Sequence, residues 1–272
     1  MAVVCKLVSM CGWKWIMLPV AGVALAVTAS GGHAADTQRT PILMELFTSE
    51  GCSSCPPVDH WVEQLDAAQP VAGAQIIVLS EHVDYWDHDG WKDPFSSASI
   101  TDRQNAYVHN LGLSDVYTPQ IVVDGAEEVK PANAQATSAT LQKEANAPMI
   151  AVHVDGAALA AGSPPFLTGK VEADGSALKR GGDVFVAVTL NSVQTDVLAG
   201  ENNGKKLTNI SVVKEMVKVG KLDKGKSFDQ AFHIKLWPDV DAANLRVVAF
   251  VQESGPGKVL GAAMTKEIAK AE

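Results

Sequence analysis

The sequence predicts an α/β domain over residues 36–148, followed by a β-rich, sandwich-like domain over residues 149–272. Strand patterns and amphipathic helix patterns alternate up to about Pro148. After Pro148, short strand patterns are separated by turn signals, which is typical of two packed β-sheets. A close cysteine pair, Cys52 and Cys55, lies at the start of the first predicted helix.

The first domain is predicted as strand, helix, strand, helix, strand, strand, helix. Pro56 and Pro57 suit the first turn of a helix, and the apolar residues that follow recur at helical spacing. The predicted strands cover residues 42–47, 75–80 and 121–123 and a short segment near Val129, and the later helices cover residues 99–111 and 133–145. Alternation implies a parallel strand pair with right-handed crossovers, and Asp124 and Gly125 predict a closing hairpin. This order is the thioredoxin arrangement.

The second domain is predicted to consist of short strands. They cover residues 149–154, 166–172, 184–190, 228–236 and 245–252, with Gly-containing turn signals between them. Residues 209–219 are compatible with either a strand or a short helix. Such spacing favours a β-sandwich.

Residues 1–35 have the pattern of a secretory signal peptide. Lys6 and Lys14 give a basic start without acidic residues, and a largely apolar run over residues 16–27 leads to small residues ending at Ala35. An uncleaved membrane anchor is the alternative, although this run is shorter than the ~20 residues that a span needs. The mature protein is therefore predicted to be periplasmic or secreted, without a stable membrane span after cleavage.

The mature chain is acidic and keeps a single cysteine pair. The sequence has 22 Lys and Arg against 31 Asp and Glu, and two basic residues leave with the leader, so 20 face 31. An acidic chain without a basic stripe is not expected to bind nucleic acid. Cys5 and Cys11 also leave with the leader. One close pair in oxidising surroundings indicates redox chemistry rather than a disulfide scaffold.

The spacing of Cys52 and Cys55 suits thiol–disulfide exchange. This reaction needs a thiolate that attacks and a second thiol near enough to resolve the mixed disulfide. A helix N-terminus stabilises a thiolate through its unpaired N–H groups and its dipole. Cys52 is therefore predicted at the helix start as the nucleophile, and Cys55, one turn inward, as the resolving thiol. The exchange needs no organic cofactor.

Two other interpretations of the pair stay open. The mature chain has too few cysteines for a four-cysteine zinc site, but a copper or zinc carrier could combine the pair with His60 or His82. An exported pair can also be a static disulfide, and the protein would then be a non-catalytic binding platform. We predict no metal site and favour exchange.

Residues 117–125 (YTPQIVVDG) resemble the segment of thioredoxins and glutaredoxins in which a cis-proline opens the third strand beside the cysteine pair. The resemblance implies that Pro119 is cis and that Thr118 offers its backbone N–H and C=O to an extended substrate. A trans proline at a strand entrance is the alternative.

A wider resemblance covers nearly the whole mature chain. Residues 45–57 (ELFTSEGCSSCPP) are similar to the signature of a family of secreted bacterial proteins known as domain of unknown function 1223. Three further segments also resemble that family: residues 82–95, Arg103 with Gln104, and residues 200–202 (GEN). The resemblance implies a thioredoxin-like domain followed by a β-rich one, and it implies no activity.

Glu45 lies seven residues before Cys52 on the first predicted strand. Thioredoxins keep a buried acid near this place as a proton acceptor, and a buried carboxyl group with a raised pKa could serve here. His82 is a second candidate for proton transfer. A Glu that faces solvent or an ion-pair partner is the alternative reading of Glu45.

Residues 82–95 follow the second predicted strand at its carboxyl end, the edge where open α/β sheets bind ligands. Tyr85, Trp86 and Trp91 are predicted to form a lid or a peptide-binding wall there, or else a capping loop whose rings pack on the core. Together these features predict a thiol–disulfide oxidoreductase-like protein that acts on protein or small thiol and disulfide substrates with an unknown redox partner.

Overall fold

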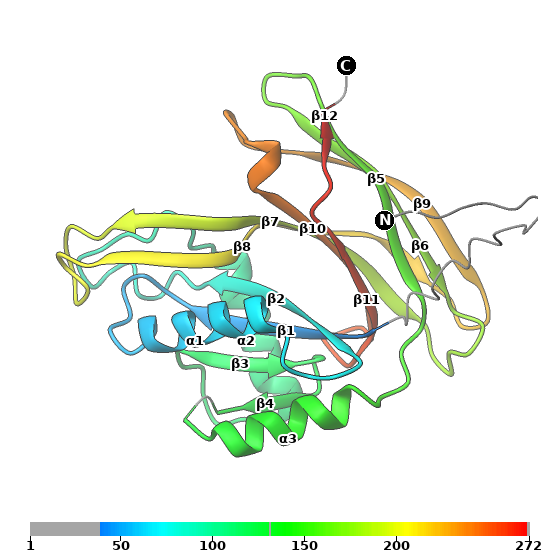
Figure 1. Ribbon diagram of the computed structural model, residues 1–272, viewed down its shortest axis with the longest axis horizontal. Helices are drawn as coiled ribbons and strands as arrows, with labels where there is room; N and C mark the ends of the chain where they lie inside the picture. Colours follow the sequence, from blue (N-terminus) through cyan, green and yellow to red (C-terminus); the bar gives the residue numbers. More distant parts are fainter. Residues whose placement is uncertain (1–38, 131, 271–272) are drawn as a thin grey trace, which may run out of the picture. The chain divides into compact units, whose positions relative to one another are not determined.

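A computed structural model describes residues 39–130 and 132–270 (Figure 1). The predicted signal peptide lies outside these residues. These residues belong to one compact unit of mixed α/β structure, with large sheets and few helices. In the described part of the chain, no helix is long and apolar enough to cross a membrane.

The first part of the chain has the predicted order of elements. These are β1 (Thr40–Thr48), α1 (Pro56–Ala68), β2 (Ala74–His82), α2 (Ala98–Leu111), β3 (Gln120–Val123), β4 (Glu127–Val129) and α3 (Ala134–Glu144). β1 pairs with β2 in parallel and with β3 antiparallel, and β3 pairs with β4 antiparallel. Asp124 and Gly125 form the predicted turn between β3 and β4. Both have positive φ, the backbone that a tight hairpin favours.

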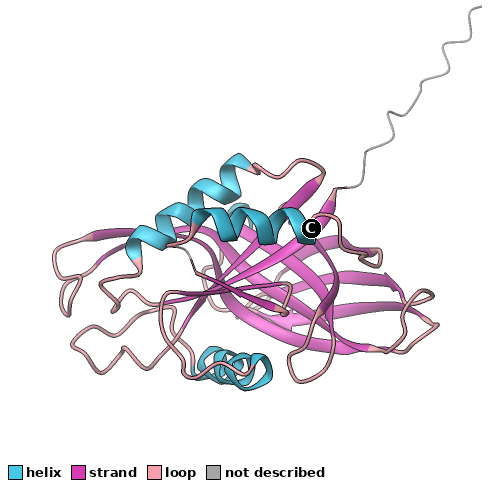
Figure 2. Cartoon of the chain, turned by 90° about the horizontal axis from the view of Figure 1, so that it is seen from below, coloured by secondary structure: helices cyan, strands magenta, loops and turns pink. Residues whose placement is uncertain are grey.

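Alternate residues of β1 face opposite sides of its sheet, because side chains along a strand alternate. Ile42 and Met44 pack with side chains of α1 and α3, whereas Leu43 and Phe47 pack with side chains of α2. Figure 2 shows two helices on one side of the strands and one helix on the other. Glu45, which lies between Leu43 and Phe47 in this alternation, therefore faces α2.

The second part of the chain consists of strands and one 3₁₀ turn. The strands are β5 (Val152–Ala160), β6 (Phe166–Asp174), β7 (Gly182–Asp196), β8 (Lys206–Leu222), β9 (Ser227–Lys235), β10 (Leu245–Gln252), β11 (Val259–Thr265) and β12 (Ala269–Lys270), and the turn is Ala242–Asn244. Residues 209–219, for which strand and helix were both open, belong to β8. β11 was not predicted, because its small residues Gly261, Ala262 and Ala263 carry no strand signal. Pairing with β10 determines its conformation.

The two parts of the chain share one sheet. Its order is β11-β10-β7-β8-β2-β1-β3-β4, and a second sheet has the order β12-β5-β6-β9. β2 and β8 pair in parallel at Ser80 and Val212, and Arg246 of β10 donates to both carboxylate oxygens of Asp66 on α1 at 3.2 and 3.0 Å. Side chains of both sheets also form one hydrophobic cluster. The boundary predicted near residue 148 lies between α3 and β5, and the large sheet contains strands from both sides of it.

A buried charged network connects α2 to β1, β2 and β10. Arg103 Nε donates to Glu45 Oε1 at 2.5 Å and lies 3.7 Å from Glu81 Oε2. Glu45 also accepts a hydrogen bond from Tyr107 Oη, and Arg103 Nη2 donates to Gln252 Oε1 at 3.1 Å. Glu45 and Glu81 are fully buried, and neither carboxyl oxygen of Glu81 has a hydrogen-bond partner. One guanidinium group thus faces two buried carboxyl groups.

Glu81→Gln is expected to remove part of the pH dependence of stability. Burial and the charge of Glu45 raise the pKa of Glu81 well above its ordinary value. A carboxyl group with a raised folded-state pKa stabilises the fold below its unfolded pKa of about 4.3, and this stability is lost as the pH rises through the folded pKa. In urea unfolding from about pH 4 to about pH 8, the variant should therefore gain at least about 1 kcal/mol relative to the native protein. A constant difference, equal to that of the exposed Glu267→Gln control, would contradict this expectation.

Candidate functional site

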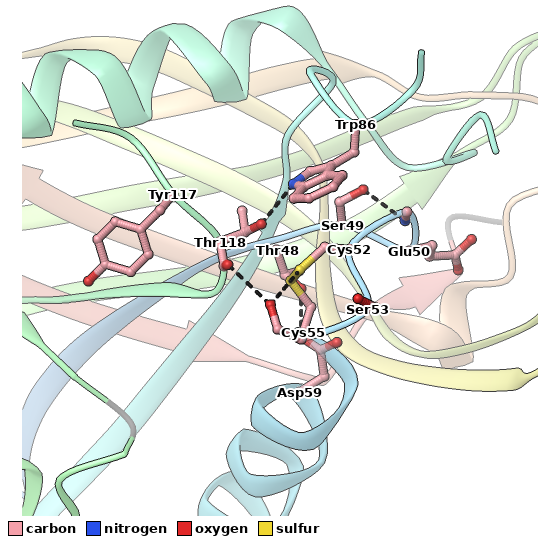
Figure 3. Close-up of a disulfide and its surroundings, with 12 residues drawn as sticks. Thr48, Ser49, Glu50, Cys52, Ser53, Cys55, Asp59, Trp86, Tyr117 and Thr118 are labelled. Atoms are coloured by element: carbon pink, nitrogen blue, oxygen red, sulfur yellow. Dashed lines mark hydrogen bonds between the residues drawn. A yellow bond between two sulfur atoms is a disulfide. The ribbon is translucent and has the colours of Figure 1, made fainter. Parts of the chain in front are cut away.

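Cys52 and Cys55 form a disulfide directly before α1 (Figure 3). Cys55 is the N-cap residue of α1, and Pro56 and Pro57 occupy its first two positions, as predicted. Cys52 lies in the preceding turn, where Cys55 N donates to Cys52 O at 3.3 Å. The prediction that Cys55 lies one turn inside the helix is wrong. The helix begins at the two prolines, because only its first turn can accept residues without an N–H.

The segment that contains Thr118 and Pro119 lies beside the disulfide. The Thr118–Pro119 peptide bond is cis, as the resemblance to thioredoxins implied. Ser54 Oγ lies 3.4 Å from Cys52 Sγ and donates to Thr118 O at 3.5 Å. Trp86 Nε1 donates to Thr118 Oγ1 at 2.8 Å, so Trp86 lies at the same place (Figure 3).

Of the other two aromatic residues of the predicted wall, Tyr85 lies with Trp86 and Trp91 lies elsewhere. Tyr85 lies beside Trp86, with 6.3 Å between ring centroids, and both rings are partly exposed. Trp91 Nε1 donates to Glu50 Oε2 at 3.0 Å, so its polar edge faces a buried carboxyl group rather than Thr118. The segment between β2 and α2 forms neither helix nor strand, as predicted.

Glu45 is not brought to the cysteine pair. It faces α2 and is bound by Arg103 and Tyr107, whereas α1, which begins after Cys55, packs on the opposite side of the sheet. The resemblance placed an acid near this position of the first strand, but it did not indicate which face of the sheet the side chain occupies.

Asp59 is the carboxyl group that lies near Cys55. Its backbone N–H donates to Cys55 O at 3.0 Å, and residues four apart on a helix share one face. Thr48 Oγ1 donates to Asp59 Oδ1 at 2.7 Å (Figure 3). Burial raises the pKa of Asp59 to about 7, against the opposing effect of the Thr48 hydrogen bond. Its spacing of four residues after Cys55 was the one signal in the sequence that could have identified it.

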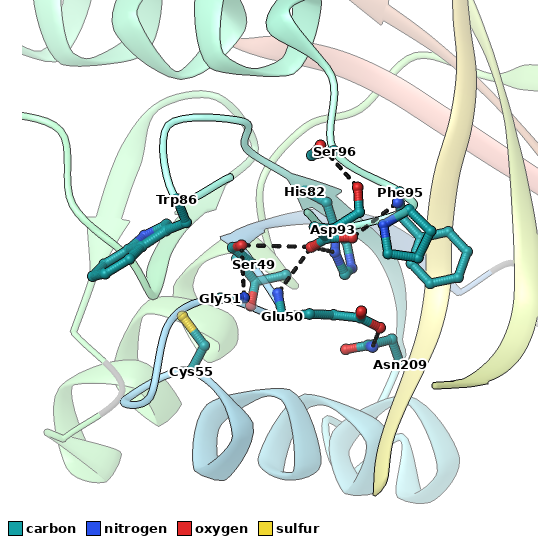
Figure 4. Close-up of polar contacts among 12 residues, drawn as sticks. Ser49, Glu50, Gly51, Cys55, His82, Trp86, Asp93, Phe95, Ser96 and Asn209 are labelled. Carbon is teal, nitrogen blue, oxygen red and sulfur yellow. Dashed lines mark hydrogen bonds and ion pairs between the residues drawn. The ribbon is translucent and has the colours of Figure 1, made fainter. Parts of the chain in front are cut away.

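A buried polar cluster holds the loop that precedes Cys52 (Figure 4). His82 Nδ1 pairs with Asp93 Oδ2 at 2.7 Å, and both side chains are fully buried. The same oxygen accepts Glu50 N at 2.8 Å and Ser49 Oγ at 3.5 Å. Burial opposes ionisation of both partners, but the attraction between them raises the pKa of His82 and lowers the pKa of Asp93. The ion pair therefore holds the backbone of Glu50 and the side chain of Ser49 in the loop that leads to the disulfide.

The two histidines considered as metal ligands have other partners. His82 pairs with Asp93. His60 is exposed, and its ring nitrogens bond to Glu63 at 3.0 Å and to Gln64 at 2.9 Å. Within residues 39–130 and 132–270, no group of three or more His, Cys, Asp and Glu side chains has an arrangement that could hold a metal ion.

The connection between β7 and β8 also contacts the loop between β1 and α1, residues 49–55, which contains both cysteines and is called the cysteine loop below. Asn202 Nδ2 donates to Glu50 O at 2.8 Å and to Cys52 O at 2.9 Å, and Asn202 is fully buried. Glu201 Oε2 accepts a hydrogen bond from Ser53 N at 3.1 Å. Cys52 and Cys55 are both 0% exposed in this arrangement. No local sequence pattern indicated this contact, because about 150 residues separate the two segments.

Comparisons with known proteins extend over most of the chain. The profile of the family described as "Protein of unknown function (DUF1223)" matches residues 43–252. The crystal structure of protein AGR_C_4864 from Agrobacterium tumefaciens is similar at a TM-score of 0.63 with 26% identity, over 83% of this chain and 94% of that one. HBP35 of Porphyromonas gingivalis is similar in fold at a TM-score of 0.62 with 15% identity, over 86% of this chain and 77% of that one. No curated protein matches the chain.

Proposed function

We propose, for a chain that belongs to the DUF1223 family of proteins of unknown function, that Cys52 and Cys55 carry out thiol–disulfide exchange in the periplasm or outside the cell. In this proposal residues 36–148 are a thioredoxin-like domain and residues 149–272 a β-sandwich-like domain. The observation that carries the proposal is the disulfide directly before α1, connected through Ser54 to the Thr118–Pro119 segment.

The steps of the exchange in the reducing direction are as follows. The Cys52 thiolate attacks one sulfur of a substrate disulfide, a bond forms between Cys52 and that sulfur, and the other substrate sulfur leaves as a thiolate that takes up a proton. Cys55 then loses its proton and attacks Cys52, which releases the second substrate thiolate and forms the Cys52–Cys55 disulfide. Two electrons pass from the protein dithiol to the substrate, and a partner dithiol restores the reduced pair. The reverse sequence oxidises a substrate dithiol.

Asp59 takes the role of proton acceptor that Glu45 was predicted to have. The Cys55 thiol must lose a proton before it attacks, and a carboxyl group with a pKa of about 7 can accept it near neutral pH. Thr48 holds the Asp59 carboxyl group by a hydrogen bond, on the helix face that Asp59 shares with Cys55.

A static disulfide in a binding protein is the second candidate function, and one observation favours it. Both cysteines have no exposed surface, so a substrate reaches Cys52 only after the surrounding segments move. Accessible low-pKa thiols are the reactive ones in general, whereas buried cysteines are inert.

Insulin reduction with dithiothreitol as the electron donor tests the proposal. The native protein is expected to accelerate insulin reduction, and Cys52→Ser, which has no nucleophilic sulfur at this position, is expected to run at the rate of dithiothreitol alone. Equal rates for the two proteins would overturn the exchange function. If the native disulfide also stays intact in dithiothreitol, while the protein remains folded, the static candidate is supported.

A further inference from the structure

The tip of the β7–β8 hairpin is a folded unit that is fixed against the cysteine loop. Val197 N donates to Lys205 O at 2.9 Å and Gly204 N donates to Val197 O at 2.8 Å, so the tip is closed by its own backbone bonds. Lys205 Nζ donates to Asn202 Oδ1 at 2.8 Å. The amide group of Asn202 is therefore held on one side by Lys205, while its nitrogen bonds to two carbonyl oxygens of the cysteine loop.

Gly200 lets this tip approach the β2–α2 loop closely. Its φ is +71°, and a Cβ at this position would lie 3.1 Å from Trp91 Cβ and 3.2 Å from Asp89 O. The tip thus contacts both the loop that contains Cys52 and the β2–α2 loop. Residues 200–202, which the sequence marked only through the family resemblance, thus have defined structural roles. Gly200 permits the close approach, and Glu201 and Asn202 bond to the cysteine loop.

Glu201 brings a negative charge to the residue next to Cys52. Its carboxylate accepts the backbone N–H of Ser53, and hydrogen bonding by the Ser53 side chain and backbone lowers the pKa of Glu201, so that it is ionised at neutral pH. A nearby negative charge disfavours a thiolate and raises the pKa of the thiol. Other titratable side chains around the loop are Glu50, Asp59, His82, Asp93 and Lys205.

We propose that this hairpin tip sets the redox poise of the Cys52–Cys55 pair, with Glu201 lowering its reduction potential and Asn202 positioning Glu201. The inference rests on the proposed function only in requiring that the pair exists in both redox states. Reduction adds two electrons and two protons to the disulfide, and the Cys52 thiol then ionises according to its pKa. A stabilised thiolate favours the reduced form and raises the reduction potential. A carboxylate bonded to the residue after Cys52 disfavours the thiolate, so it lowers the potential and makes the pair more reducing. A partner that displaced the tip would make it more oxidising.

Glu201→Gln tests the charge, since glutamine keeps an acceptor for Ser53 N. The protein is equilibrated with mixtures of reduced and oxidised dithiothreitol, whose dithiol is oxidised as the cysteine pair is reduced. The equilibrium constant for reduction of the pair should rise about threefold, which equals about 14 mV at 29.6 mV per tenfold change. The pKa of Cys52, from thiolate absorbance, should fall. Both effects should shrink at 1 M salt, where the screening length is about 3 Å.

Asn202→Ala tests the positioning role. Without the two hydrogen bonds to the loop, Glu201 loses its fixed place. Glu201→Gln should then change the equilibrium constant in the Asn202→Ala background by less than half as much, on a logarithmic scale, as in the native background. The exposed Glu267→Gln is the control for loss of one negative charge. An unchanged equilibrium constant in Glu201→Gln at low salt, or an equal change in Glu267→Gln, would overturn the inference.

These outcomes are separate from those of the insulin test, because the equilibrium constant does not depend on turnover. A shifted constant in a protein that does not reduce insulin would support the hairpin inference and reject the proposed function. Active insulin reduction with an unchanged equilibrium constant in Glu201→Gln would support the proposed function and reject the hairpin inference. If excess dithiothreitol cannot reduce the native cysteine pair in the folded protein, both the proposed function and the hairpin inference are rejected.

Discussion

Arg103→Met is expected to lower the free energy of unfolding by about 3–5 kcal/mol, as breaking a buried ion pair from one side typically does. The side chain of Arg103 is only 10% exposed and bonds to Glu45, with Glu81 at 3.7 Å. Methionine has a similar length and no charge, so it leaves two buried carboxyl groups without a cation. Urea unfolding of the oxidised protein, followed by tryptophan fluorescence, measures the loss.

Two further variants separate the electrostatic cause from lost packing. Arg180→Met removes an exposed arginine that pairs with Glu253, and it should change stability by less than about 1 kcal/mol. Adding Glu45→Gln and Glu81→Gln to Arg103→Met should restore part of the loss, because no carboxyl group is then left to ionise without a cation in the protein interior. If Arg103→Met costs no more than Arg180→Met, the network does not stabilise the fold in this way.

Asp59→Asn is expected to slow the attack of Cys55 on the mixed disulfide by about 100-fold at pH 7, within the range that general base catalysis contributes. The pKa of Asp59 is raised to about 7, and a base acts only when it is deprotonated. The native rate should therefore increase as the pH rises towards 7 and then level off, and the variant should lack this inflection. Single-turnover kinetics with a small disulfide substrate, in which the second thiol release is recorded, measures this step.

The pH profile distinguishes proton transfer from a merely structural role of Asp59. Thr48→Val removes the hydrogen bond that lowers the pKa of Asp59, so its inflection should move to higher pH while the step still occurs. Asp102→Asn, an exposed carboxylate on α2, should leave both rate and profile unchanged. A native inflection that persists in Asp59→Asn would assign the proton acceptor to another group.

Local signals were sufficient for much of the fold. Pro56 and Pro57 marked the start of α1, the apolar stripe after them indicated a helix, and Asp124 with Gly125 marked the β3–β4 turn. These features depend on steric preferences and periodicity within a few residues, which the sequence displays directly. β11 shows where such signals fail, since its small residues become a strand only through pairing with β10.

The sequence by itself determined the family, the order of elements in residues 40–144 and the position of the cysteine pair before α1. Only the tertiary structure decided which carboxyl group lies near that pair: the side chain of Glu45 faces Arg103 on the α2 side, and Asp59 lies near Cys55. The hydrogen bond from Asn202 to the backbone of Cys52 is likewise visible only in the tertiary structure. The physical reason is that these contacts join segments far apart in the chain, and their geometry follows from sheet pairing and packing rather than from local backbone preference.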